Sequence, residues 1–216
     1  MLDMCSSELT LLDLKINSSK SCALRIGNRF KSPCRKLEVN DESLVWADRA
    51  KYLGIYIENG AKFKSSFKET KSKFYRSANG ILCKLGTCDS TSVKVSLMTS
   101  IALPTLLYGM EALSLNNADL NLLDHPWTRT FEKIFKTFDK NVVKQCQFYT
   151  GSLSFHKYYS LRVISFLLGC AASDNILIKL LSQQSASEDV YRVASRYGCT
   201  SDSFMLDYRN IIINAE

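Results

Sequence analysis

The chain contains no Asp-Asp dipeptide and no C-x-x-C pair, and only two of its 216 residues are histidines. Two-metal phosphoryl transfer needs clustered carboxylates to hold Mg²⁺, and zinc sites need closely spaced cysteine and histidine ligands. We therefore predict no metal site and expect the thiols to be reduced and structural. The eight cysteines are scattered, at positions 5, 22, 34, 83, 88, 146, 170 and 199.

Three motifs of nucleotide-binding and hydrolytic enzymes are also missing. The sequence has no G-x-x-x-x-G-K-[ST], no G-x-G-x-x-G and no G-x-S-x-G. Phosphate-cradling loops and a serine nucleophile elbow are therefore unsupported. The acidic residues Asp41, Glu42 and Asp48 lie close together in the sequence, but two of them fall on a predicted turn, where solvated carboxylates are common.

Long hydrophobic runs are absent as well. The apolar stretches 166–172 and 101–110 are shorter than the roughly 20 residues that a membrane helix requires. The first five residues lack the basic start and apolar stretch of a secretory signal. We expect an intracellular protein of the nucleus or cytoplasm with no membrane partner. The length of 216 residues allows one large domain or two small ones, and the 46% apolar content is sufficient for a buried core.

Positive charge is concentrated in one segment of the chain. Residues 61–100 carry eight basic and two acidic side chains, so this segment alone contributes +6 of the total net charge of +7. The rest of the chain is nearly balanced. A concentrated excess of lysine and arginine is a stronger indication of nucleic-acid binding than a basic average.

The pattern of the first 60 residues predicts a small mixed α and β region. A helix is expected over 3–13, strands over 14–17 and 22–26, and a hairpin whose strands cover 37–39 and 43–46. The alternation of apolar and β-branched residues over 52–57 predicts a further strand, which ends at Asn59 and Gly60.

From residue 61 onward the apolar period changes to that of helices. A first helix is predicted over 62–85, and a second over 91–103 that ends or kinks at Pro104. We therefore expect an α+β fold, with a small α+β region followed by an all-helical one and a boundary near residue 60. Further helices are predicted over 105–114, 118–137, 139–149, 157–171, 174–184 and, weakly, 187–196.

Three phrases occur in an order that resembles one family of polymerases: Leu14 to Ser21 with N-x-x-K-S, Lys51 to Ile57 with K-Y-L-G, and Pro104 to Ala112 with P-x-L-L-Y-G-x-E. Together they resemble the distal part of a non-LTR (LINE-type) retrotransposon reverse transcriptase, over roughly residues 1–170. The resemblance implies a distal palm remnant at 1–60 and a helical thumb with a C-terminal extension at 61–216. The Tyr-x-Asp-Asp hairpin of that family would precede the first residue of this chain.

The resemblance also implies roles for the first two phrases. Lys20 matches a palm lysine beside the incoming nucleotide, where it would neutralise phosphate or donate a proton to pyrophosphate. Alternatively, Lys20 is a solvated turn residue and Asn17 satisfies backbone groups of the turn. Tyr52, Leu53 and Gly54 match a strand near the primer grip, and the alternative is a core strand with Gly54 at a bulge.

The basic helix predicted over 62–85 is the candidate nucleic-acid contact. Lysines can neutralise phosphates and release counterions, and an aromatic ring can stack on a base or sugar. The alternative is an ordinary solvated face, although Glu69 is the only acidic residue in this helix. Its candidate residues are Lys64, Lys68 and Lys71, with Tyr75 in line on one side, and Lys73 and Arg76 farther round.

The sequence therefore favours a truncated RNA-directed DNA polymerase that is inactive alone. Mg²⁺ would serve the parent family, but its aspartate ligands are absent here, so we expect no cofactor in this chain. The expected partners are an RNA–DNA or DNA backbone, bound weakly and in a salt-sensitive manner, and the missing polymerase portion. Two alternatives remain: a helical protein-interaction module derived from such an element, and a non-functional relic.

Overall fold

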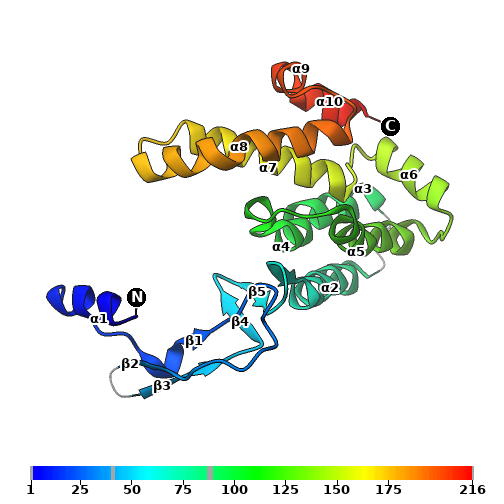
Figure 1. Ribbon diagram of the computed structural model, residues 1–216. Helices are drawn as coiled ribbons and strands as arrows, with labels where there is room; N and C mark the ends of the chain where they lie inside the picture. The colour runs from blue at the N-terminus through cyan, green and yellow to red at the C-terminus, as the bar shows by residue number, and fades with distance from the viewer. Residues whose placement is uncertain (1, 40–41, 87–89, 216) are drawn as a thin grey trace. The chain divides into compact units, whose positions relative to one another are not determined.

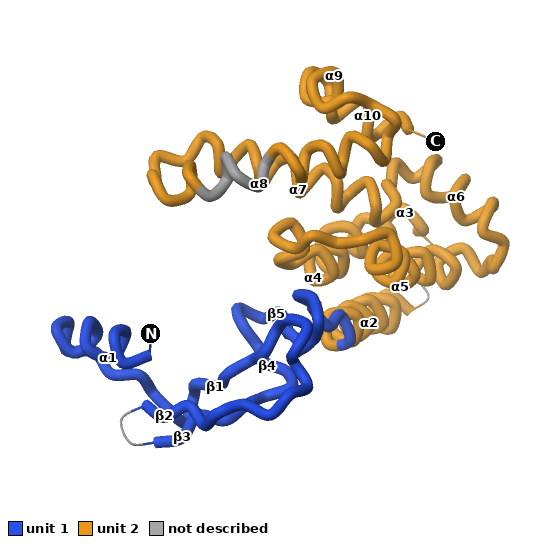
Figure 2. The backbone as a smooth tube through the Cα atoms, viewed as in Figure 1, with its two compact units in different colours: residues 1–68 blue, residues 69–216 orange. Residues whose placement is uncertain are grey.

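The computed structural model describes residues 2–39, 42–86 and 90–215, except for the side chains of residues 181–186. Helices make up 62% of the chain and strands 11%, which confirms the predicted α+β class. The chain divides into two compact units, residues 1–68 and residues 69–216 (Figure 2). The hairpin turn at 40–41 and the cysteine at 88 lie outside the described residues.

The N-terminal unit combines one helix with two small sheets (Figure 1). In the first sheet β3 is central, with β1 parallel to it on one side and β2 antiparallel on the other. The second sheet is an antiparallel meander in the order β4-β5-β6. The elements are α1 (Leu2–Leu11), the 3₁₀ turn η1 (Ser18–Lys20), β1 (Cys22–Ala23), β2 (Leu37–Val39), β3 (Glu42–Trp46), β4 (Arg49–Tyr52), β5 (Ile55–Glu58) and β6 (Lys64–Ser66).

Two strand predictions in this unit are wrong. Residues 14–17 form no strand, because Asn17 instead caps η1. Residues 52–57 do not form one strand but reverse direction, since Leu53 and Gly54 have φ angles of +46° and +87° and join β4 to β5 as a two-residue hairpin loop. Two consecutive positive φ angles are the signature of a type I′ turn, whose twist matches that of the flanking strands.

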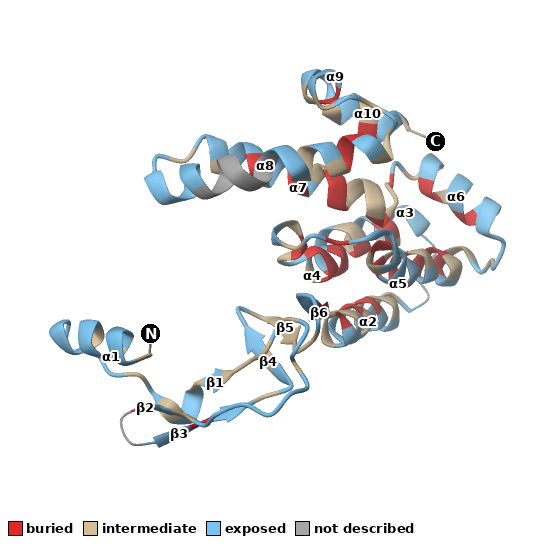
Figure 3. Cartoon of the chain, in the orientation of Figure 1, coloured by how far each residue is buried: buried red, intermediate tan, exposed pale blue. Residues whose placement is uncertain are grey.

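The N-terminal unit buries few side chains (Figure 3). Val39, Leu44 and Phe67 are its buried apolar residues among those described. Helix α1 has no buried residue, and Leu11 within it is 80% exposed. This unit is therefore held together more by the hydrogen bonds of its sheets than by a hydrophobic core.

All the regular elements described in the C-terminal unit are helices (Figure 1). Helix α7 lies against α5 on one side and α8 on another, and α10 also packs against α7. The single helix α8 replaces the two helices predicted over 174–184 and 187–196. The elements are α2 (Lys68–Leu85), α3 (Thr91–Leu97), η2 (Met98–Ala102), α4 (Leu103–Leu107), η3 (Met110–Ala112), α5 (Asn117–Phe135), α6 (Lys140–Tyr149), α7 (Phe155–Ala171), α8 (Ile176–Arg196), α9 (Ser201–Leu206) and α10 (Tyr208–Asn214).

Pro104 does not end its helix, although an end at this residue was the first of the two outcomes predicted there. Helical structure continues from α3 through the π-helical turn η2 and into α4, where Pro104 occupies the first turn. The wider turn lets the N–H of Leu103 reach the carbonyl of Met98, five residues back. The proline lacks an N–H and tends to disrupt an α-helical ladder, and the π register absorbs this disruption.

The stretch Thr91–Ala112 is long and apolar enough to cross a membrane by length and composition alone, with a mean hydropathy of 1.3. Within the unit, however, Met98, Ala102 and Leu106 are fully buried. This burial is the arrangement expected of a core helix.

The core of the C-terminal unit is built around Trp127 of α5. Its ring lies edge-on to Phe74, Phe131 and Tyr158, with centroids 6.5, 5.1 and 6.1 Å away. Its Nε1–H donates a hydrogen bond of 2.9 Å to the carbonyl oxygen of Leu153. Trp127 therefore connects α2, α5, α7 and the loop before α7 through one buried side chain.

A second buried aromatic residue fixes the segment after η3. The hydroxyl of Tyr159 donates to the carbonyl oxygen of Leu113 at 2.8 Å, and Arg196 Nη2 donates to the carbonyl oxygen of Leu115 at 2.9 Å. Glu111 pairs with Arg162 at 3.4 Å, as expected for a carboxylate with a structural partner in the P-x-L-L-Y-G-x-E phrase.

We predict that Trp127→Ala destabilises the C-terminal unit by about 3–5 kcal/mol, because it removes a buried indole and its hydrogen bond. Urea unfolding followed by far-UV circular dichroism would measure the loss. The matched control is Trp46→Ala, which removes a 39% exposed indole from the N-terminal unit and should cost much less. Equal losses for the two variants would contradict the central role of Trp127.

We predict that Leu53→Asn stabilises the β4–β5 hairpin by about 0.5–1 kcal/mol, since asparagine tolerates positive φ better than leucine. Amide hydrogen exchange of β4 and β5 should slow by a few-fold. Gly54→Ala at the neighbouring position should accelerate exchange, because alanine is strained at φ +87°. Faster exchange in Leu53→Asn would count against the assigned turn.

Candidate nucleic-acid interface

The basic helix begins later than the sequence pattern predicts. Helix α2 starts at Lys68, and the residues before it form strand β6. Phe74 and Ala78 are buried on its inner face, four residues apart, as expected for one face of a helix. Phe63 is 58% exposed and does not extend this apolar stripe, so the predicted start at residue 62 is wrong.

Because Phe74 and Ala78 are buried, the basic residues of α2 lie on its solvent-facing side or at the edge of its buried face. Lys68, Lys73 and Arg76 are exposed, and Lys71 is half-buried. Glu69 in the first turn is the helix's only acidic residue. The described part of α2 therefore presents an excess of positive charge on the faces that its core contacts leave open.

Lys64 is not part of this helical surface. It lies exposed on β6, and the strand register places it opposite Glu58 of β5. An opposite charge at the facing cross-strand position offsets its own charge locally. The prediction that Lys64 continues the lysine row of the helix is wrong, because the chain is still extended at this point.

Tyr75 faces a second basic group on α5, which the sequence analysis did not identify. An open cavity of about 330 Å³ is lined by Tyr75, Arg129, Glu132, Lys133 and Phe138. Burial raises the pKa of the Tyr75 hydroxyl, the charge of Arg129 lowers it, and that of Glu132 raises it. The phenol is therefore protonated near neutral pH and can donate a hydrogen bond.

Two contacts hold the α5 residues in place. Arg129 Nη1 lies 2.8 Å from Glu132 Oε2, and Lys133 Nζ donates to Asn79 Oδ1 of α2 at 2.9 Å. Because the cavity contains one acidic and two basic side chains, it adds one net positive charge beside Tyr75. Arg129 and Lys133 are spaced by four residues, which places them on the same side of α5. The four-residue spacing of Arg129 and Lys133 was the feature of the sequence from which this second basic group could have been predicted.

Lys20 and Asn17 lie in a compact, exposed turn. Asn17 Oδ1 accepts hydrogen bonds from the backbone N–H of Lys20 at 3.1 Å and from Ser19 Oγ at 2.7 Å. Ser18 Oγ in turn donates to a carboxylate oxygen of Glu42. This geometry is the one expected of a turn stabilised by an asparagine side chain.

Tyr52, Leu53 and Gly54 form the end of an exposed hairpin. Tyr52 is 66% exposed and Leu53 is 73% exposed, so neither packs in a core strand. The alternative of a core strand with Gly54 at a bulge is therefore wrong. The exposed tip is accessible to a partner, but the two residues that join β4 to β5, Leu53 and Gly54, carry no charge.

No cluster of three or more histidine, cysteine or acidic residues suited to a metal ion occurs within the described ranges. Comparison of the chain with family models, curated proteins and solved structures found no match.

Proposed function

We propose that this protein binds the sugar-phosphate backbone of nucleic acid through α2, as the distal palm and thumb portion of a non-LTR reverse transcriptase. The phrases N-x-x-K-S, K-Y-L-G and P-x-L-L-Y-G-x-E support the lineage. The chain contains no Asp-Asp dipeptide, and we expect no polymerase activity from it alone. The proposed activity is binding, with an RNA–DNA hybrid or DNA duplex as the ligand.

The observation that carries the proposal is the excess of positive charge on α2, whose only acidic residue is Glu69. Residues Lys71, Lys73 and Arg76 lie within two turns of the helix, and the buried Phe74 fixes which way they face. Each can neutralise one phosphate and release its counterion. The cavity beside Tyr75 supplies an aromatic ring for stacking, which is tolerant of sequence.

We predict that a labelled RNA–DNA primer-template binds the full chain and that its affinity falls as salt rises. The test is fluorescence anisotropy across a salt series with the wild type and the triple variant Lys71→Gln/Lys73→Gln/Arg76→Gln. Glutamine preserves helix propensity, so α2 should stay folded. The variant should bind about 10-fold more weakly or worse, and the slope of log K against log salt should fall by about 2 to 3.

The matched control removes the same number of charges elsewhere in the unit. Lys140 and Lys144 of α6 and Arg209 of α10 are exposed, and their triple glutamine variant should retain most of the affinity. A second variant, Tyr75→Leu, should weaken binding without changing the salt slope, since it removes a ring and no charge. Equal weakening by the two triple variants would show that only the net charge matters and would contradict a site on α2.

One observation favours the alternative of a protein-interaction module. The first turns of α8 expose Ile176, Leu177 and Leu180 at 71%, 65% and 59%. Neighbouring exposed apolar side chains on one helix are typical of protein contact surfaces. If the folded, monomeric chain does not bind nucleic acid at low salt, the nucleic-acid proposal fails, and this alternative or a non-functional relic takes its place.

A further inference from the structure

One serine of the chain is followed directly by proline. The three prolines follow a serine, a leucine and a histidine, so Ser32-Pro33 is the only such step in the sequence. Arg35 stands three residues after Ser32. Proline-directed serine/threonine kinases act on a hydroxyl residue that precedes proline, and those of the cyclin-dependent type favour a basic residue at the third position after it. The stretch Ser-Pro-Cys-Arg therefore has the pattern of a phosphorylation site.

Ser32 lies in an exposed loop between β1 and β2 of the N-terminal unit. Residues 31–36 are all exposed, and residues 33–36 belong to no helix or strand. The residue before a proline favours extended backbone, which is the conformation in which a substrate segment enters a kinase cleft. An enzyme can bind an exposed segment without regular structure and leave the neighbouring sheet intact. The Ser32 hydroxyl is therefore accessible on the folded chain.

Hydrogen bonds hold this loop at both ends. The backbone N–H of Gly27 donates to the carbonyl oxygen of Gly60 at 2.8 Å, and Trp46 Nε1 donates to the carbonyl oxygen of Arg35 at 3.2 Å. Both contacts lie outside the step from Ser32 to the proline. They keep the loop in place and leave the acceptor open.

The guanidinium group of Arg25 lies against the acceptor residue. Its Nη1 donates to the carbonyl oxygen of Ser32 at 2.5 Å and lies 2.6 Å from Cys34 Sγ. Residues 25–36 carry no acidic side chain. A phosphoserine carries a charge of about −1.5 to −2 near neutral pH, and arginine groups bind its oxygens strongly. The basic residues of this segment are Arg25, Arg29, Lys31, Arg35 and Lys36.

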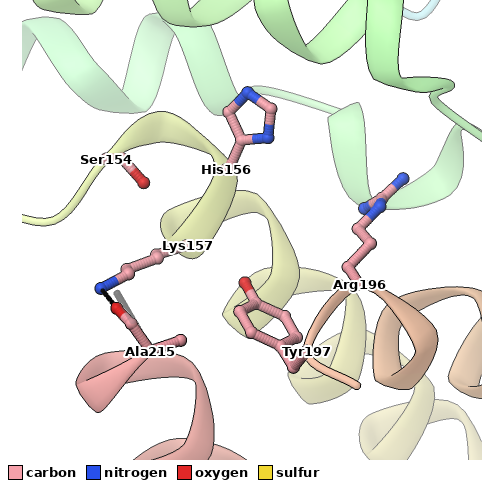
Figure 4. Close-up of a pocket in the computed structure, with 6 residues that line it drawn as sticks. All are labelled: Ser154, His156, Lys157, Arg196, Tyr197 and Ala215. Carbon is pink, nitrogen blue, oxygen red and sulfur yellow. Dashed lines mark hydrogen bonds between the residues drawn. The ribbon is translucent and has the colours of Figure 1, made fainter. Parts of the chain in front are cut away.

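A serine of the C-terminal unit that also lies near basic side chains lacks these features. Ser154 is half-buried at the start of α7, and Phe155 follows it. Figure 4 shows Lys157 directed toward Ala215, to whose carbonyl oxygen it donates, while Arg196 extends away from both. Basic side chains near a hydroxyl are thus not sufficient, and Ser154 serves as an internal comparison for Ser32.

We propose that Ser32 is phosphorylated by a proline-directed serine/threonine kinase and that Arg25 then binds the phosphate group. Ser32 Oγ attacks the γ-phosphorus of ATP, the bond from that phosphorus to the bridging oxygen of the β-phosphate breaks, and ADP leaves. The hydroxyl proton passes to the catalytic base of the kinase. The phosphate joins the middle of the loop to Arg25 at its start. This proposal does not rest on nucleic-acid binding.

The first test is incubation of the full chain with ATP and a purified cyclin-dependent kinase, with the phosphate located by tandem mass spectrometry. We expect one phosphate on Ser32 and none on Ser154. Ser32→Ala should abolish incorporation. Pro33→Ala should lower its rate about 10-fold or more, because it removes the contact that the kinase selects.

A matched pair of variants separates the recognition pattern from charge alone. Arg35→Gln and Lys36→Gln each remove one positive charge from neighbouring exposed residues of the loop. Arg35→Gln should slow phosphorylation several-fold and Lys36→Gln should leave the rate nearly unchanged, since position 35 alone is the third residue after the acceptor. The proposal is overturned if Ser32 of the folded chain stays unmodified, if the two variants are slowed equally, or if serines without a following proline react as fast.

Phosphorus NMR of the phosphorylated chain across a pH series tests the role of Arg25. The guanidinium should hold the second pKa of the phosphoserine below its usual value of about 6, because a nearby positive charge favours the dianion. Arg25→Gln should return this pKa toward the usual value, whereas Lys36→Gln should leave it as in the wild type. The same pKa in the wild type and in Arg25→Gln would overturn the assignment of Arg25 as the phosphate ligand.

Discussion

The packing of Trp127 is the contact on which the rest of the helical unit depends. Its indole is fully buried and lies edge-on against three other aromatic rings. A buried indole N–H must find an acceptor, and here it is the carbonyl oxygen of Leu153 in the loop before α7. One side chain therefore brings α2 and α7 to the same face of α5 and fixes the loop between α6 and α7.

The orientation of α2 follows from this packing, and the character of its surface follows from that orientation. Phe74 contacts Trp127, so the neighbouring Tyr75 is turned toward Arg129 and Lys133 of α5. The lysines and the arginine at other angles around the helix remain in water, where their charge costs little. Hydrophobic burial thus determines where the charge lies, although it contributes nothing to the charge itself. Packing also places a charged group at the end of α8, where Arg196 donates a hydrogen bond to the carbonyl oxygen of Leu115.

The N-terminal unit depends on a different balance of forces. Its described strands are at most five residues long. Met4 and Leu11 of α1 are 71% and 80% exposed, and Leu12, directly after the helix, is 68% exposed. Small units bury a low fraction of their surface, so sheet hydrogen bonds and turn geometry carry more of their stability. The positive φ angle of Leu53 matters in this setting, because a strained turn holds two of the three strands of its sheet together.

Local sequence determined the α+β class and the hairpin formed by β2 and β3. It also determined helices α5, α6 and α7 to within a few residues, since these helices have a strong apolar period or clear capping residues. It also located the excess of positive charge. Only the tertiary structure decided that the chain reverses at Leu53, that Lys64 lies on a strand, and that Lys133 meets Asn79, 54 residues away. The reason is physical: periodicity reports which face of an element is apolar, whereas the partner of that face is set by packing between residues far apart in the chain.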